Sequence, residues 1–280
     1  TMDGDGGLWV AHDGGVTRVE VRNPGALHGP PSGLRSRQVF ALTLHRGRLH
    51  VGTSQGVAVR DPASGRFTPL RGSPGSIGSL LSTEEGLIAT ADRLVLFRDD
   101  GSLETIDNAG AFLSVQRFRR DPDRLLATTN AGLRVYRRTN GRWQHEGTVA
   151  AARGRLIQLT QDDAGWLWAV REASQILRID WRQGMRFDAT IETVGGAHGL
   201  PSYAATQSAV QLIVMGGALT IASRGSLLRH DTATDRFGPE TRIAGLPLAE
   251  ARRQILALGN DEFLFTRVGG PARLGLIQPT

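Results

Sequence analysis

One pattern recurs along the whole chain and limits what it can fold into. In each copy, a short apolar run ends in a small residue and a turn, and a second apolar run, usually carrying Arg, follows. The clearest copies are residues 7–20, 49–61 and 165–180. The small residues that mark the seven copies are Ala11, Gly52, Ala89, Thr128, Val170, Ala222 and Thr266, at spacings of 37 to 52 residues. A repeat of about 40 residues made of short strands predicts a β-propeller, with one four-stranded blade in each repeat.

The second repeat can be divided into four strands by its turn residues. We expect strands at 39–44, 49–53, 56–60 and 66–70, separated by turns rich in Gly, Ser and Pro. The inner-strand candidates of the later repeats are 76–81, 111–118, 155–160, 209–214 and 253–258. Several of these runs are nearly continuous in apolar residues, as expected for strands covered on both faces. The predicted fold is therefore all-β, a seven-bladed propeller of four-stranded antiparallel blades.

The repeat also predicts the domain organisation. A single blade cannot bury both of its faces and must stack on its neighbours, so residues 1–280 are expected to form one propeller domain. No inner strand precedes Trp9, and no outer strand follows Leu276. We therefore expect incomplete first and last blades, and a chain that is a fragment of a longer sensor protein.

Composition excludes several classes of function. The chain has no Cys, so disulfides, thiolate metal sites and cysteine nucleophiles are ruled out. The formal charge is +6, but the 33 basic residues are all Arg and alternate with 27 acidic residues through every repeat. A nucleic-acid partner would require a clustered basic stripe, and none is expected. The longest apolar stretch, 209–222, is interrupted and too short to span a bilayer, so this segment is not expected to insert into a membrane.

An Arg two residues before an acid closes the third strand of several repeats, as in Arg178 with Asp180 and Arg229 with Asp231. Residues two apart on a strand lie on the same face. This pattern predicts a solvated ladder of weak ion pairs. The adjacent acids Asp162 and Asp163 are expected to serve as turn residues.

Two kinds of segment carry a family resemblance. Asp163-Ala-Gly165 precedes Leu167-Trp168, Asp3-Gly-Asp-Gly6 precedes Leu8-Trp9, and Gly199-Leu-Pro-Ser202 precedes the sixth inner strand. In these segments, repeated in phase, the chain resembles the two-component regulator propellers over essentially its whole length. Only the first and fifth repeats keep the Trp of that pattern.

The resemblance implies a role in signal input. Propellers of that family form the periplasmic part of a membrane-anchored sensor whose output domain is a histidine kinase or a diguanylate cyclase. The expected function is a non-catalytic sensory propeller that binds a small molecule, often a glycan fragment, or contacts other domains of the same receptor. The alternative is a scaffold for protein contacts, including a homodimer.

An enzyme is a second alternative. Streptogramin lyases are propellers with a similar repeat and a magnesium-dependent site centred on His and Glu, and this chain offers Trp168, Arg171, Glu172 and His198. The other blades do not present matching histidines, and no two histidines have a zinc-site spacing. The Gly-x-Ser-x-Gly match at 52–56 lies between two strands, where a nucleophile elbow does not form. We therefore expect no catalysis, no metal and no cofactor.

Propeller geometry predicts where a ligand would bind. Loops from the second to the third strand, and from the fourth strand to the next blade, meet on one face around the axis. The residues expected there are Arg35, Arg37, Gln55, Asn130, Arg171, Glu172, His198 and Tyr203. Arg side chains at this face could grip a carboxylate or phosphate with two donors each, and Tyr203 could stack on a sugar ring.

Overall fold

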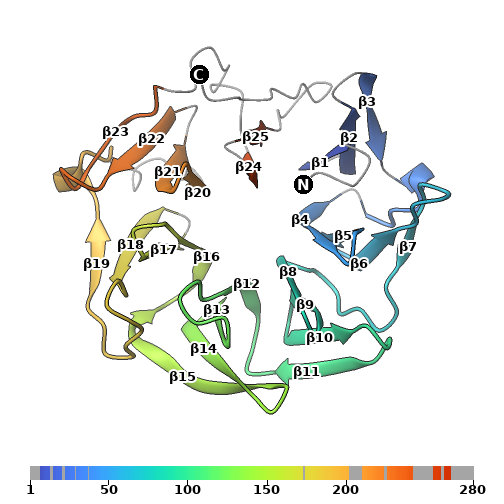
Figure 1. Ribbon diagram of the computed structural model, residues 1–280, viewed down its shortest axis with the longest axis horizontal. Helices are drawn as coiled ribbons and strands as arrows, with labels where there is room; N and C mark the ends of the chain where they lie inside the picture. The colour runs from blue at the N-terminus through green and yellow to red at the C-terminus, as the bar shows by residue number, and fades with distance from the viewer. Residues whose placement is uncertain are drawn as a thin grey trace.

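The chain forms a ring of small sheets, shown in the computed structural model of Figure 1. The structure describes residues 7–12, 15–20, 23–28, 30–36, 38–172, 174–201, 210–223, 226–241, 255–259 and 262–265. In these residues the only helices are two short 3-10 turns, η1 (Pro30–Ser32) and η2 (Gly196–His198). None of the helices in the described part of the chain is long and apolar enough to cross a membrane. The prediction of an all-β propeller is confirmed.

Seven antiparallel sheets follow one another around the ring, and we number them as blades 1 to 7 in chain order. Blade 1 has β1 (Gly7–His12), β2 (Gly15–Glu20) and β3 (Asn23–His28), and blade 7 has β24 (Ile255–Gly259) and β25 (Glu262–Phe265). The five blades between them each have four strands, β4 (Val39–His45), β5 (Arg48–Thr53), β6 (Gly56–Arg60) and β7 (Phe67–Pro69); β8 (Ser79–Thr83), β9 (Gly86–Thr90), β10 (Leu94–Arg98) and β11 (Leu103–Asp107); β12 (Phe112–Arg117), β13 (Arg124–Thr129), β14 (Gly132–Thr139) and β15 (Arg142–Arg153); β16 (Leu156–Gln161), β17 (Trp166–Arg171), β18 (Gln175–Asp180) and β19 (Ile191–Val194); β20 (Gln211–Met215), β21 (Ala218–Ser223), β22 (Ser226–Asp231) and β23 (Arg236–Pro239).

The seven sheets agree in number with the seven repeats of the sequence. Among the described residues, blade 1 has three strands and blade 7 has two, and the incomplete first and last blades stay a prediction. The seventh repeat marker, Thr266, lies outside the described residues. The ring order in Figure 1 places the N-terminal and C-terminal sheets next to each other.

The inner strand of blade 3 begins three residues later than predicted, at Ser79. Ile77 is fully buried, and its backbone N–H donates to the carbonyl of Thr53 in blade 2 at 2.9 Å. A Cβ on Gly52 would lie 2.7 Å from the Ile77 side chain, so only Gly leaves room for this contact. The segment before β8 is therefore an inter-blade link, and the small residue that ends β5 has a packing function.

Neighbouring blades share their apolar cores. One cluster joins Leu126 and Val135 of blade 4 to Leu167 and Ile179 of blade 5, and Trp181 closes it. All five side chains are fully buried. Each blade is thus stabilised by the faces of its neighbours, as in other repeat folds.

A buried arginine on the third strand of blade 5 joins this blade to blade 6. Arg178 is 5% exposed and lies over the rings of Trp166 and Trp168, at 4.4 and 5.5 Å from their centroids. Its guanidinium pairs with Glu192 of its own blade and with Asp235 of blade 6, at 2.9 Å between Nη2 and Oδ2 of Asp235. The hydrogen bond from Arg178 holds the pKa of Asp235 well below its usual range.

The predicted solvated ladder is therefore wrong at Arg178. Asp180, two residues along, pairs with Arg182 at 2.8 Å and not with Arg178. Likewise Arg229 lies 3.6 Å from Glu240, whereas Asp231 accepts bonds from its own turn. Arg178 pairs with an acid on the outer strand of its own blade and with one in a turn of the next blade, and Arg229 with an acid after its own outer strand. The spacing along one strand does not reveal these partners.

Candidate ligand-binding face

The two faces of the ring differ in the loops that form them. Turns between first and second strands, and between third and fourth strands, lie on one face, which we call the ion-paired face. Turns between second and third strands, and the crossings from each fourth strand to the next blade, lie on the other, which we call the arginine face. The predicted binding residues were assigned to the arginine face.

The structure places two of the predicted residues together at blade 2. Arg35 is exposed in the crossing into β4, and Gln55 is exposed in the turn between β5 and β6. The two loops are joined by a 2.6 Å hydrogen bond between Ser36 Oγ and Ser54 Oγ. Ser54, the centre of the Gly-x-Ser-x-Gly match, is thus a loop link. The predicted Arg37 and Tyr203 lie outside the described residues.

Three further predicted residues meet at blades 4 and 5. Asn130 follows β13, Arg171 is the last residue of β17, and Glu172 follows that strand. The crossing residue Arg155 connects them, because its Nε donates to Asn130 Oδ1 at 3.3 Å and its carbonyl accepts from the backbone N–H of Glu172 at 3.1 Å. Arg155 was not among the predicted binding residues, although it lies in the same class of loop as Arg35.

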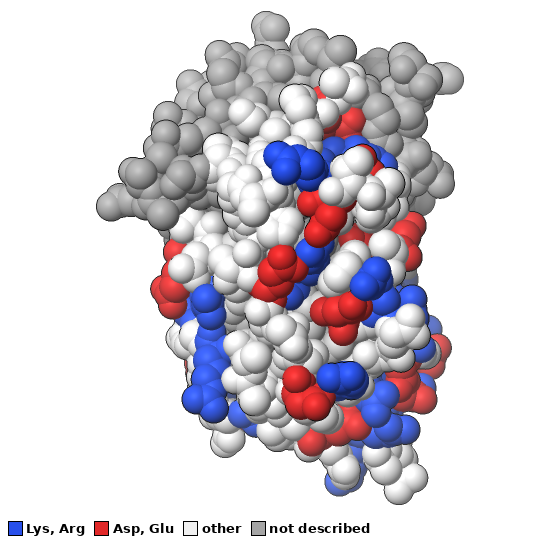
Figure 2. Space-filling model, turned by 90° about the vertical axis from the view of Figure 1, so that its left-hand side faces the viewer, with Lys and Arg blue, Asp and Glu red and all other residues white. Residues whose placement is uncertain are grey.

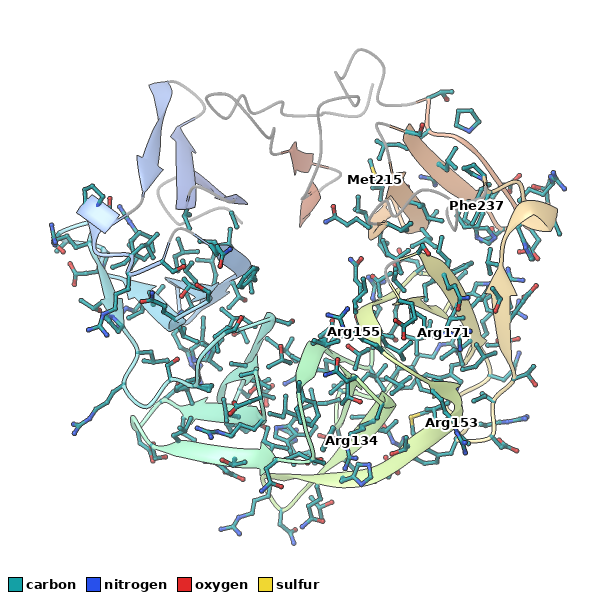
Figure 3. The ribbon with its side chains drawn as sticks, turned by 180° about the vertical axis from the view of Figure 1, so that it is seen from behind. Arg134, Arg153, Arg155, Arg171, Met215 and Phe237 are labelled. Atoms are coloured by element: carbon teal, nitrogen blue, oxygen red, sulfur yellow. The ribbon has the colours of Figure 1, made fainter. Side chains whose placement is uncertain are left out.

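We call Arg153, Arg155 and Arg171 the arginine cluster; Figure 3 labels all three. Gly154 lies between the first two, with a φ of +88° that favours glycine. A Cβ at this position would lie 3.3 Å from Arg171 Cδ, so the Arg171 side chain passes directly over the loop. The glycine turn therefore brings arginines from two separate loops together.

The guanidinium groups of this cluster are only partly used by the protein. Each Nε donates to a neutral oxygen, of Asn130 for Arg155, of Gln175 for Arg171 and of the Ala150 carbonyl for Arg153. Within the described residues, none of the three guanidinium groups forms an ion pair with a carboxylate, and Glu172 Oε1 is the acid atom near the loop, 3.8 Å from where a Cβ on Gly154 would lie. The terminal nitrogens can therefore bind a planar anion through paired donors.

His198 lies apart from the other predicted residues and next to carboxylates. It ends η2, and its Nε2 lies 2.8 Å from Glu192 Oε1 and 4.0 Å from Asp235 Oδ2. Its Nδ1 accepts from the backbone N–H of Gly195 at 3.3 Å. These contacts fix His198 at the outer junction of blades 5 and 6, beside the carboxylates that bind Arg178.

Trp168, the remaining member of the lyase-like set, is buried. Its indole N–H donates to Asp162 Oδ2 at 2.8 Å, and its ring stacks edge-on with His230. Asp162 also accepts from the backbone N–H of Trp166 at 2.9 Å, which gives it the expected role of a turn residue. No group of three His, Cys, Asp or Glu side chains suited to a metal ion occurs in the described part of the chain.

Comparison with known proteins gives matches at the level of structure. No family model matches the sequence, and no curated protein matches it. The extracellular domain assigned to a hybrid two-component system of B. thetaiotaomicron superposes with a TM-score of 0.71 at 14% identity, covering 99% of this chain and 37% of that one. This likeness shows the fold. The chain spans little more than a third of the length of that neighbour.

Other propellers are also similar. Virginiamycin B lyase from Staphylococcus aureus matches with a TM-score of 0.59 at 15% identity, covering 86% of this chain and 84% of the lyase. The WD40 β-propeller domain of Doa1 matches with a TM-score of 0.65 at 12% identity, covering 92% and 85%. A sensor, an enzyme and a WD40 domain share this fold, so the function has to be argued from the site.

Proposed function

We propose that this chain is a non-catalytic sensory propeller of a bacterial membrane-bound regulator of the two-component type, and that its arginine face binds an anionic ligand. The single propeller domain would lie in the periplasm, with the other domains of the receptor as its partners. The observation that carries the proposal is the arginine cluster, whose guanidinium groups have no carboxylate partner among the described residues.

The charge of the surrounding loops supports the same ligand class. The described loops of this face carry Arg35, Arg71, Arg93, Arg153, Arg155 and Arg171. The acids there are Asp92, Asp107, Glu172 and Glu240; Asp107 is already paired with Arg134 at 2.9 Å, and Glu240 lies 3.6 Å from Arg229. An excess of arginine around a polar loop cluster attracts anions and selects against cations. The ligand class that fits is a small carboxylate, or a glycan fragment bearing uronic acid groups.

The lyase alternative has less support from the site. Both ring nitrogens of His198 are engaged by the protein, and its described contacts do not include Arg171 or Glu172. A general base must be within hydrogen-bond reach of the proton that it abstracts. The sensory function is therefore the better explanation of this face.

The test is a thermal-shift and calorimetric titration with a matched pair of probes, trigalacturonic acid and its fully methyl-esterified form. We expect the acid to raise the melting temperature, because a ligand at a hundredfold excess over its Kd stabilises the folded state by about 2.7 kcal/mol. The ester should have no effect, and binding of the acid should weaken as salt is added.

Two double variants locate the site. Arg155→Gln with Arg171→Gln should weaken binding of the acid at least tenfold. Arg66→Gln with Arg142→Gln is the matched control, because both arginines are exposed and lie on the ion-paired face. Equal loss in both double variants would mean a general charge effect and would contradict the proposal, as would equal binding of the ester.

A further inference from the structure

A cavity of about 180 Å³ lies on the opposite, ion-paired face, between blades 4 and 5. The turn after β12 lines it with Phe118, Arg119 and Arg120, and the end of β16 with the turn after it lines it with Gln161, Asp162, Asp163 and Gly165. Sites for drug-sized ligands measure about 300–1,000 Å³. The cavity therefore suits a ligand of only a few heavy atoms.

The base of the cavity is rigid and partly apolar. Phe118 and Asp162 are 4% and 2% exposed, and Asp162 has its two oxygens occupied by the backbone N–H of Trp166 and the indole of Trp168. The side-chain amide of Gln161 binds the neighbouring turn. Its oxygen accepts from the backbone N–H of Arg119 at 3.2 Å, and its NH2 group donates to the carbonyl of Arg117 at 3.1 Å. The two turns are thus held in register across the blade boundary.

The rim carries charges of both signs. Arg119 and Asp163, which form an ion pair, are 51% and 64% exposed. Asp163 is held by blade 6, because the backbone N–H of Asp163 donates to the carbonyl of Gly217 in that blade at 2.8 Å. Arg120 donates to the carbonyl of Arg182 and crosses over Gly165, where a Cβ would lie 2.9 Å from Arg120 Nη2. Three blades thus build one rim.

This combination excludes simple ions as the preferred ligand. A cation would be repelled by two guanidinium groups, and Asp162 has no free oxygen to offer it. A lone anion would meet Asp163, and the arginine face suits it better. A ligand with an ammonium group and a carboxylate close together would form two ion pairs, one with Asp163 and one with the arginines, in place of the Arg119–Asp163 pair. Breaking that pair costs little, because exposed ion pairs contribute little stability.

We propose that this cavity binds a free α-amino acid with a small apolar side chain. The carboxylate would pair with Arg119 and Arg120, the ammonium with Asp163, and the side chain would lie against Phe118. The site is separate from the arginine cluster and would give the propeller a second input on its other face.

The test is calorimetric titration of the chain with L-valine, L-alanine and L-leucine. The probes that separate the two charges are isovalerate, isobutylamine, N-acetyl-L-valine and L-valinamide. We expect saturable binding of at least one amino acid, and binding at least tenfold weaker for every analogue that lacks one charge. Isovalerate or isobutylamine binding as tightly as valine would overturn the proposal.

The variants are Asp163→Asn and Arg119→Gln, both at exposed positions, with circular dichroism melting to confirm that they fold. Each should weaken amino-acid binding at least tenfold. The double variant Arg155→Gln with Arg171→Gln should leave amino-acid binding unchanged. A negative result for the cavity is therefore distinguishable from a negative result for the arginine face. Absence of saturable heat with all three amino acids at millimolar concentration, or unchanged binding in both single variants, would overturn the proposal.

Discussion

The two faces of the ring use the same residue type in opposite ways. On the ion-paired face, arginines bridge neighbouring blades, as in Arg46 with Asp99 at 2.9 Å and Arg138 with Glu85. On the arginine face, the cluster at blades 4 and 5 donates to neutral oxygens and keeps its terminal nitrogens free of carboxylates among the described residues. Arginine holds the blades together on the ion-paired face, whereas the arginine cluster at blades 4 and 5 remains available for a ligand.

The side of the ring between the two faces follows the first pattern. In Figure 2, Arg and acidic side chains lie next to one another over the visible edge of the described residues. At blades 5 and 6, Arg178 pairs with Glu192, Arg182 with Asp180 and Arg186 with Asp188. The arginine cluster therefore stands out by its lack of acidic partners, and not by its content of arginine.

The largest effect on stability is expected at Arg178. Arg178→Met removes a buried cation that binds two carboxylates and two indole rings, so the free energy of unfolding should fall by about 3 kcal/mol. Arg186→Met is the control, because its pair with Asp188 is exposed and contributes about 0–1 kcal/mol. Urea unfolding of both variants measures the difference. Equal losses would show that burial of Arg178 has no special role.

A smaller effect should appear in the acid dependence of stability. The hydrogen bonds from Arg178 and His230 lower the pKa of Asp235 in the folded chain. In the unfolded chain an Asp titrates near about 3.9, so below that pH the unfolded state takes up a proton that the folded state does not. The contribution of Asp235 is therefore fully present above about pH 4 and is lost as the pH falls.

Asp235→Asn should flatten the fall of stability between about pH 4 and pH 2.5, measured by urea unfolding at each pH. Asp188→Asn is the matched control, because this carboxyl is 82% exposed and has one exposed partner. An unchanged slope in Asp235→Asn would show that the junction of blades 5 and 6 does not contribute to acid sensitivity.

The repeat predicts the strands because each strand is encoded by its own residues. β6 agrees with the expected 56–60 at both ends, and β5 differs by one residue at its start. The predicted start of β8 was three residues too early, because Ile77 packs against the preceding blade and does not belong to the strand. Local patterns cannot reveal a residue that leaves its own strand to pack elsewhere.

The candidate sites were predictable only in part, for the same reason. Loop positions follow from the strand order, and this predicted that Asn130, Arg171 and Glu172 lie at or just after the ends of second strands, where the structure has them. Arg155 was missed, although Arg153-Gly-Arg155 repeats the Arg-x-Arg spacing of Arg35 and Arg37 before an inner strand. The cavity and the Arg178 network could not be predicted, because they join residues 42 to 57 positions apart through the closure of the ring.

The smallest effect on stability is expected at the arginine cluster, and it tests the comparison most directly. If these arginines are kept for a ligand, Arg155→Gln with Arg171→Gln should leave the free energy of unfolding within about 0.5 kcal/mol of the starting value, because no ion pair within the described residues is lost. Urea unfolding without ligand measures this, with Arg46→Gln as the reference for an arginine that bridges two blades. A loss well above that of Arg46→Gln would mean that the cluster holds blades 4 and 5 together, and the difference between the two faces would then be one of geometry and not of use.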